Sequence, residues 1–155
     1  MGPVVGQNFG GRRADRVRHA VYAAFGITTG LMVVLTAVTW LTAPHMIRGF
    51  SSDPAVIRHG SEYLAIMGWV FVASGIVFSG SSVFQGLGNT IPSLISTASR
   101  LVLFALPAVW LSTRPGFQVR HVWFLSVGSQ AVQAIMVLLL LRRELRRKLA
   151  FAEVI

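Results

Sequence analysis

Several polar side chains of this sequence lie inside long apolar stretches, at spacings that would gather them for chemistry. In the stretch 121–141 they recur at i, i+3, i+4 and i+7, so one helix face carries them against Val, Leu and Ile. They are Ser126, Ser129, Gln130 and Gln133. Hydroxyl and amide groups bind ligands through hydrogen bonds. We expect this face to meet the inside of a helix bundle or a cavity.

Two further apolar stretches carry similar polar faces. The stretch 61–85 holds Ser74, Ser81, Ser82 and Gln85 on one face, with Gly68 and Gly75 nearby. The stretch 91–111 holds Ser93, Ser96, Thr97 and Arg100, with Pro107 on the same line. Small and hydroxyl residues in membrane helices mostly serve packing, and the alternative is a wet substrate path. The sequence leaves both roles open.

Arg100 is the one ionisable residue well inside an apolar stretch. It lies about nine residues into that stretch, or roughly 13 Å of helix, which is near the middle of a bilayer. Burying a guanidinium there costs at least a few kcal/mol, so Arg100 must find a partner, reach the membrane surface or line water. A structural role and a pathway role are both open.

Covalent and metal chemistry have little support. The sequence has no cysteine, which excludes disulfides, thiolates and cysteine metal sites, and its four histidines are scattered. Ser74 stands beside Gly75 as the nucleophile of an intramembrane serine protease would, but such a serine needs a base. His121 falls at the far end of its own stretch. We therefore predict no catalytic residue, no metal ligand and no bound cofactor.

Membrane-spanning helices are the elements that must position these side chains. Apolar residues make up 54% of the 155 residues and charged residues only 12%, with a mean hydropathy of +0.65. Four stretches come near the ~20 residues that cross a bilayer core, and they run over 19–43, 61–85, 91–111 and 121–141. We predict an all-α polytopic membrane protein, with a leading cytoplasmic segment 1–18, a four-helix bundle 19–141 and a basic cytoplasmic tail 142–155.

The distribution of basic residues predicts the orientation of the bundle. One side, which holds both termini and the turn near residue 86, carries Arg12, Arg13, Arg16, Arg18, Arg142, Arg143, Arg146, Arg147 and Lys148. The other side carries Arg48, Arg58, Arg114 and Arg120. The positive-inside rule therefore puts both termini in the cytoplasm of a cell (inner or plasma) membrane, with all four tryptophans toward the outer interface. Such clusters predict contacts with membrane lipid and not with nucleic acid.

Turn and helix-end signals separate the spans. The stretch 80–93 predicts a tight cytoplasmic turn, because it crowds together the turn formers Gly86, Gly88, Asn89 and Pro92. Pro44 is expected to stop the first helix. Asp53 and Pro54 predict an N-cap followed by proline at the first helical position of the next helix.

A GxxxG spacing occurs in the first span, at Gly26 and Gly30. Two glycines one helical turn apart leave a flat strip on the helix surface. We expect this strip to allow close backbone approach between helices.

Two motifs give the chain its resemblance to a known family. The first is Val4-Val5-Gly6-Gln7-Asn8-Phe9-Gly10, followed by a basic run over 12–17. The second is Phe84-Gln85-Gly86-Leu87-Gly88-Asn89-Thr90-Ile91-Pro92-Ser93, with Arg100 and Pro107 further on. Both resemble motifs of the multidrug and toxic compound extrusion (MATE) family. The resemblance covers essentially the whole chain, in order.

This resemblance implies an antiporter of twelve helices in two six-helix lobes, which exports cationic or amphipathic compounds against a sodium or proton gradient. The chain resembles the last four helices of the second lobe, and its first five residues resemble the end of the preceding helix. The implied partners are such substrates and the remaining transporter helices. We expect the chain alone to export nothing, because alternating access moves one lobe against the other.

From the polar faces, the arginine inside a span and the turn, we take Ser74, Gln85, Asn89, Arg100, Gln130 and Gln133 as substrate-path candidates. The resemblance marks Gly6, Gln7, Asn8 and Gly10 as the family loop. Sodium-coupled members often carry a carboxylate near the position of Ser74, whereas the nearest acids here are Asp53 and Glu62. The coupling site for sodium or proton is thus expected outside this chain.

Two other classes of membrane protein fit the length and the four spans. A small four-helix multidrug transporter that works as a dimer needs a glutamate in its first helix, and 19–43 contains no acid. A structural or vestigial four-helix membrane protein is the other alternative.

Overall fold

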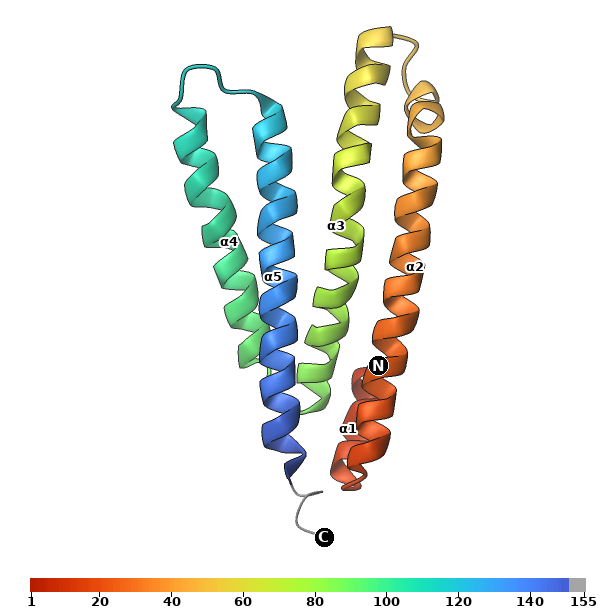
Figure 1. The fold of residues 1–155 in the computed structure, drawn as a ribbon, viewed down its shortest axis with the longest axis vertical. Helices are drawn as coiled ribbons and strands as arrows, with labels where there is room; N and C mark the ends of the chain where they lie inside the picture. Colours follow the sequence, from red (N-terminus) through yellow and green to blue (C-terminus); the bar gives the residue numbers. More distant parts are fainter. Residues whose placement is uncertain (151–155) are drawn as a thin grey trace.

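The computed structural model describes residues 1–150, and all of its regular structure is helical within that range. The helices are α1 (Gly2–Gly10), α2 (Ala14–Arg48), α3 (Pro54–Gly86), α4 (Ile91–Ser112) and α5 (Val119–Lys148) (Figure 1). Four of them, α2 to α5, are long and apolar enough to cross a membrane. The all-α, four-span prediction is confirmed. Residues 151–155 of the predicted tail lie outside the described residues.

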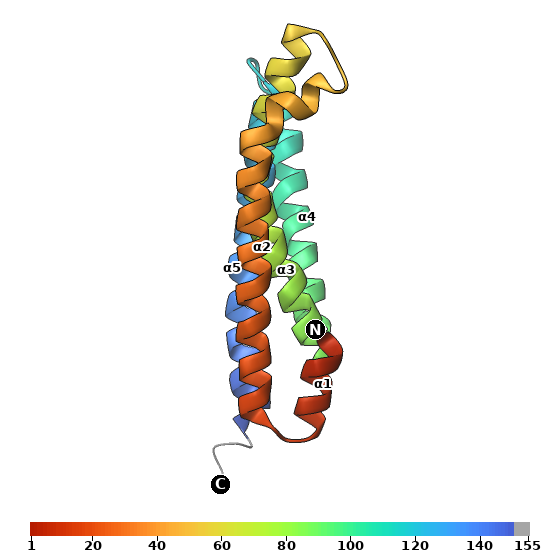
Figure 2. The ribbon, with the colours of Figure 1, turned by 90° about the vertical axis from the view of Figure 1, so that its right-hand side faces the viewer.

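The four long helices form two hairpins, α2–α3 and α4–α5, which meet through α3 and α5. The hairpins lie closest together at the end of the molecule that holds both termini (Figure 1). The short helix α1 packs against α2 and α3 at this same end, as the side view in Figure 2 shows. We call this end, where α2 begins and α5 finishes, the basic end.

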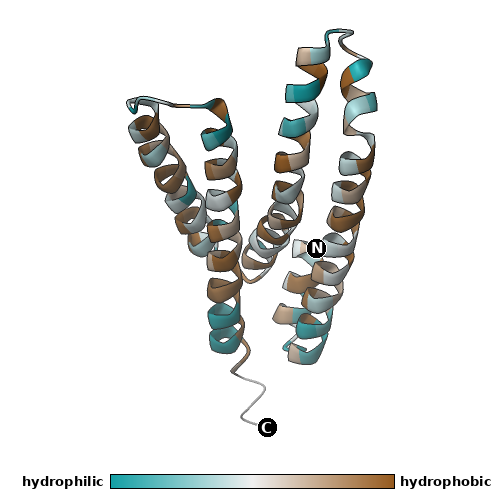
Figure 3. Cartoon of the chain, turned by 45° about the horizontal axis from the view of Figure 1, so that its top comes forward, coloured by the Kyte–Doolittle hydropathy of each residue, from teal (hydrophilic) through white to brown (hydrophobic). Residues whose placement is uncertain are grey.

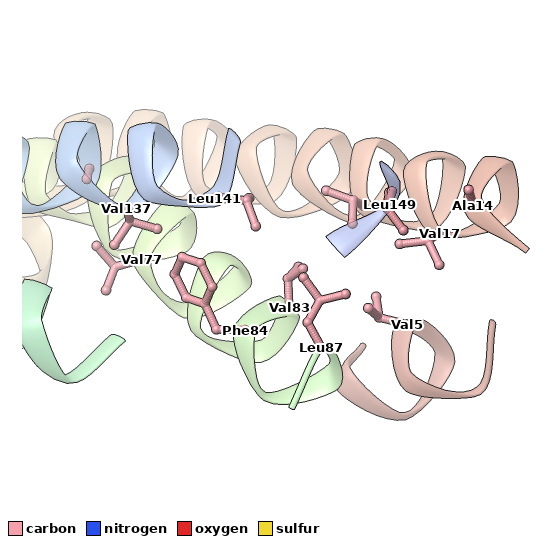
Figure 4. Close-up of a cluster of buried hydrophobic side chains, with 12 residues drawn as sticks. Val5, Ala14, Val17, Val77, Val83, Phe84, Leu87, Val137, Leu141 and Leu149 are labelled. Atoms are coloured by element: carbon pink, nitrogen blue, oxygen red, sulfur yellow. The ribbon is translucent and has the colours of Figure 1, made fainter. Parts of the chain in front are cut away.

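An apolar core joins the two hairpins at the basic end. It is built from Val17 and Val21 of α2, Val83 and Phe84 of α3, Val137 and Leu141 of α5, with Val5 and Leu149 closing it (Figure 4). All of these side chains are almost completely buried. Because the core draws on α1, α2, α3 and α5, it fixes the position of α5 relative to the first hairpin.

The α3–α4 connection is the tight turn that the glycines predict. Gly88 has φ +71°, a conformation that L side chains rarely adopt. The Asn89 amide donates to the Phe84 carbonyl at 2.9 Å and the Gly88 amide donates to the Gln85 carbonyl at 3.0 Å. This hydrogen-bond pair is the Schellman ending of a helix, and it reverses the chain within a few residues.

The helix-end prediction is confirmed for α3 and wrong for α2. Asp53 caps α3 by accepting from the Ala55 amide at 2.7 Å, with Pro54 at the first helical position. Pro44, however, does not stop α2, which continues to Arg48. A proline removes a single hydrogen bond of the helix, and the bonded turns on either side carry α2 through it.

The GxxxG spacing of the first span faces no other helix within residues 1–150. A Cβ added at Gly26 or Gly30 meets nothing within 4 Å, so the spacing brings no helix close. Close approach occurs instead along α3, where a Cβ on Gly68 would lie 2.8 Å from Trp40 of α2. One on Gly75 would lie 2.8 Å from Met32 of α2. Spacing alone does not tell which of several glycine pairs faces a neighbour.

Candidate functional site

A polar contact between α3 and α5 brings together two of the predicted candidates. The side-chain amide of Gln130 donates a hydrogen bond to Oγ of Ser74 at 3.1 Å. Gln130 is 4% exposed, and Ser74 is half-buried. The contact therefore lies inside the interface between the two hairpins, and we call Ser74, Gln130 and Gln133 the polar seam.

Two oxygens of the polar seam lack a partner. Oε1 of Gln130 and Oε1 of Gln133 are buried, and neither accepts a hydrogen bond within the described residues. Gln133 is 3% exposed and lies one turn from Gln130 on α5. A buried amide oxygen left without a donor costs about 1–3 kcal/mol. Each of these oxygens would be stabilised by a hydrogen-bond donor or a small cation.

The rest of the α5 stripe is placed as its helical spacing predicts. Ser129 is buried beside Gln130, and its hydroxyl donates to the Ser126 carbonyl at 3.0 Å. A second polar contact lies nearer the basic end, where the hydroxyls of Ser81 and Ser93 hydrogen-bond at 2.8 Å. The stripe of α5 and the serines of α3 and α4 therefore follow the inside of the bundle.

Asn89 lies apart from the polar seam, at the basic end. Its side-chain amide donates to Oε1 of Glu144 at 2.9 Å, and Arg147 lies 3.3 Å from the same oxygen. Glu144 is a residue that sequence reasoning missed, because it is one acid among five basic residues of the α5 end. The available signal was its position at helical spacing from Leu141 and Val137, on the buried face.

Three of the polar residues predicted on span faces do not join the polar seam. Gln85 and Thr97 are exposed. Arg100 is half-buried on α4, and within residues 1–150 it forms no ion pair with an acidic side chain. His121 also lies apart from Ser74. It takes part in the capping box of α5, nine residues or roughly 13 Å of helix before Gln130, which is the residue that contacts Ser74.

The two sequence motifs meet in space. Gly2 and Gly6 of α1 face Gly86 at the end of α3: a Cβ on Gly86 would lie 2.6 Å from the Gly2 carbonyl, and one on Gly6 would lie 3.2 Å from the Gly86 carbonyl. The Gly2 amide also donates to Oγ of Ser82 at 2.9 Å. Only glycine allows this contact between backbones. The loop motif is thus helical over Gly6–Gly10, and Gln7, Asn8 and Gly10 complete α1.

The far end of the α3–α5 interface carries its own contacts. Glu62 of α3 pairs with Arg120 of α5 at 2.6 Å, and the rings of Tyr63 and Trp123 meet edge to face at 5.3 Å. Within the first hairpin, Trp40 of α2 packs edge to face on Trp69 of α3 at 4.9 Å. The polar seam therefore lies between two closed contacts, one at each end of the same interface.

The hydroxyl and amide groups of the polar seam are suited to hydrogen bonding with a small molecule. Hydroxyls and amides are neutral hydrogen-bonding groups, and no group of acids, histidines or cysteines within residues 1–150 is arranged to hold a metal ion. The seam has no acid or base beside Ser74 that would activate it as a nucleophile.

Comparison with known proteins adds one match. A family model described as MatE matches residues 1–111, which include both sequence motifs and the helices α1 to α3, together with α4 as far as Leu111. Helix α5, with Gln130, Gln133 and Glu144, lies beyond the matched range. No curated protein matches the chain.

Proposed function

Since this chain belongs to the MatE family of membrane efflux transporters, we propose that it works as part of a cation-coupled antiporter that exports drugs or other xenobiotics. The substrates would be small cationic or amphipathic compounds. The family's proteins are transporters and not enzymes.

The unpaired oxygens of Gln130 and Gln133 are the observation that carries this proposal. They lie at the contact between the two hairpins, on the face of α5 that is buried in the bundle. A cation at this point would be stabilised by the two amide oxygens, which accept no hydrogen bond from the protein. Ser74 completes the set, because its hydroxyl accepts a hydrogen bond from Gln130 within the same interface.

Within residues 1–150, no acidic side chain lies in the middle of the bundle where it could bind the coupling ion. Asp53 is used as the N-cap of α3, Glu62 is paired with Arg120, and Glu144 is paired at the basic end. We propose that the sodium or proton site is supplied by other transporter helices. Of the two ions, the neutral oxygens of the polar seam favour neither by themselves.

We propose further that the chain needs those helices in order to transport. Only 6% of the membrane-crossing window of α4 is buried in the bundle, and Arg100 on the same helix is only half-buried. A guanidinium in a membrane span needs a partner or water. Packing of further transporter helices against α4 would supply both, and it would complete a second body for alternating access.

The orientation and location follow the charge bias. The basic end carries nine basic residues, so we propose a cell membrane location with both termini and the α3–α4 turn in the cytoplasm. The ring contacts of the tryptophans with Arg114 and Tyr63 then lie at the outer surface. In this orientation Gln85 and Asn89 lie at the cytoplasmic end of the α3–α5 interface.

A reconstitution experiment tests the proposal. Vesicles would contain this chain alone, or this chain expressed together with the first eight helices of a full-length MatE-family transporter. Ethidium efflux driven by an imposed sodium or proton gradient is expected only from the second preparation. Efflux by the chain alone would overturn the need for further helices, and no efflux from either preparation, with both parts assembled, would overturn the transport function.

A further inference from the structure

A groove between α2 and α5 at the basic end plays no part in the polar seam. Its volume is about 650 Å³. Both walls end in the apolar core, because Val21 of α2 and Leu141 of α5 line the groove and are also buried core residues. The groove therefore has an apolar floor that is part of the packed core of the bundle.

Each helix presents one stripe to this groove. On α2 the lining residues recur at i, i+3, i+4 and i+7, as Arg18, Val21, Tyr22 and Phe25. On α5 they begin with Leu138 and Leu141 and end with Arg142, Leu145 and Arg146. Both spacings put the residues on a single helix face.

In both stripes the charged residues lie toward the same end of the molecule. α2 runs away from the basic end and α5 runs toward it, so the arginines of both stripes lie at the basic end (Figure 1). From Arg18 to Phe25 the helix rises roughly 10 Å, and from Leu138 to Arg146 roughly 12 Å. Figure 3 shows hydrophilic residues gathered at the basic end of α5, with apolar turns beyond them. The groove is cationic at its mouth and apolar further into the membrane.

We propose that this groove is a binding site for an anionic phospholipid of the leaflet at the basic end. The phosphate would lie among the guanidinium groups of Arg18, Arg142 and Arg146, whose planar donors match phosphate oxygens. The first part of an acyl chain would follow Tyr22, Phe25 and Leu138 along the floor. Basic pockets between membrane helices are suited to such head groups.

The charges around the groove favour this occupant over others. Arg142 and Arg146 make no ion pair within residues 1–150, and Arg18 has only Asp15 at 3.9 Å, whose side chain is 99% exposed. Glu144 is held by Asn89 and Arg147 instead. A second copy of the chain would bring the same three cations, and an apolar helix would leave them without an anion.

Native mass spectrometry of the detergent-purified chain tests this site with dioleoyl phosphatidylglycerol as the probe. The matched zwitterionic lipid is dioleoyl phosphatidylcholine. The test variant R18Q/R142Q removes one guanidinium from each wall. The control R16Q/R143Q removes the same charge from the same helices, at residues that do not line the groove. A further variant, Leu138→Gln, changes only the apolar wall.

We expect a one-to-one phosphatidylglycerol adduct that phosphatidylcholine does not displace. The affinity should fall roughly thirtyfold in R18Q/R142Q, change little in the control, and fall in Leu138→Gln. Equal losses in the test and control pair would mean a diffuse cationic surface and overturn the site. So would displacement by inorganic phosphate at equal concentration, because the apolar groove would then contribute nothing. A lipid-free dimer would assign the groove to a second copy and also overturn the proposal.

Discussion

The side-chain amide of Asn89 donates a 2.9 Å hydrogen bond to Oε1 of Glu144, and so ties the α3–α4 turn to the last turns of α5. Arg147 approaches the same oxygen at 3.3 Å. The Glu144 side chain is 8% exposed, so these donors replace most of the water that a free carboxylate would bind. The contact closes the basic end of the α3–α5 interface, on one side of the polar seam.

Glu144→Ala should destabilise the chain by about 1–3 kcal/mol, because the variant leaves the half-buried Asn89 amide without its acceptor and removes a buried, hydrogen-bonded side chain. Glu62→Ala is the matched control. Glu62 also bridges the hairpins, but its side chain is 31% exposed and its pair with Arg120 is half in solvent. Exposed pairs contribute little. Thermal unfolding in detergent measures both, and equal shifts for the two variants would contradict the role given to Glu144.

Gly86→Ala should loosen α1 from α3. The new Cβ would lie 2.6 Å from the Gly2 carbonyl and 2.9 Å from Cβ of Val5, and neither atom belongs to a flexible side-chain end. Overpacking of this kind costs about 1–3 kcal/mol. Val5 is buried and the chain has no cysteine, so maleimide labelling of V5C reports the change.

In that experiment, V5C should label slowly in the parent chain and quickly in the Gly86→Ala background. Gly26→Ala serves as the control, because its Cβ meets nothing within 4 Å. Unchanged labelling in Gly86→Ala would show that α1 is not held at this contact.

Gln133→Leu should stabilise the fold while it impairs transport. The substitution removes a buried oxygen that has no donor, and a leucine of similar volume fits the same space. We expect a higher unfolding temperature in detergent and a slower ethidium efflux in the assembled transporter. Gln85→Leu, at an exposed position of α3, should leave the unfolding temperature unchanged. A normal efflux rate in Gln133→Leu would show that the unpaired oxygen of Gln133 has no role in transport.

Single cysteines test the orientation. S51C and F117C lie in the two connections at the end opposite the basic end, and N8C lies in α1. In intact cells a membrane-impermeant maleimide should label S51C and F117C but not N8C, because the positive-inside rule puts the basic end in the cytoplasm. Labelling of N8C with protection of the other two would invert the topology.

Much of the fold follows from the sequence, because each span carries its signal locally. Apolar length predicts the four helices, and the capping pair Asp53–Pro54 places the start of α3. The stripe of Gln130 and Gln133 predicts the buried face of α5, since helical spacing fixes which residues share a face.

The contacts between helices do not follow from the sequence in the same way. Gly26 and Gly30 have the spacing for close approach and are exposed, whereas Gly2 and Gly6, which have the same spacing, face Gly86. Pro44 breaks one hydrogen bond without ending α2. The pairing of Asn89 with Glu144 depends on how α5 returns past the α3–α4 turn, which no local pattern encodes.

Access of a cation to Gln133 is the most direct test of the claim that the polar seam lies on a transport path. The chain has no cysteine, so Q133C in the assembled transporter carries the only thiol of this polypeptide. We predict that a small cationic thiosulfonate labels Q133C during gradient-driven turnover, that ethidium protects it, and that V137C, one turn further into the core, stays unlabelled. Failure of Q133C to label, or labelling that ethidium does not slow, would contradict the account.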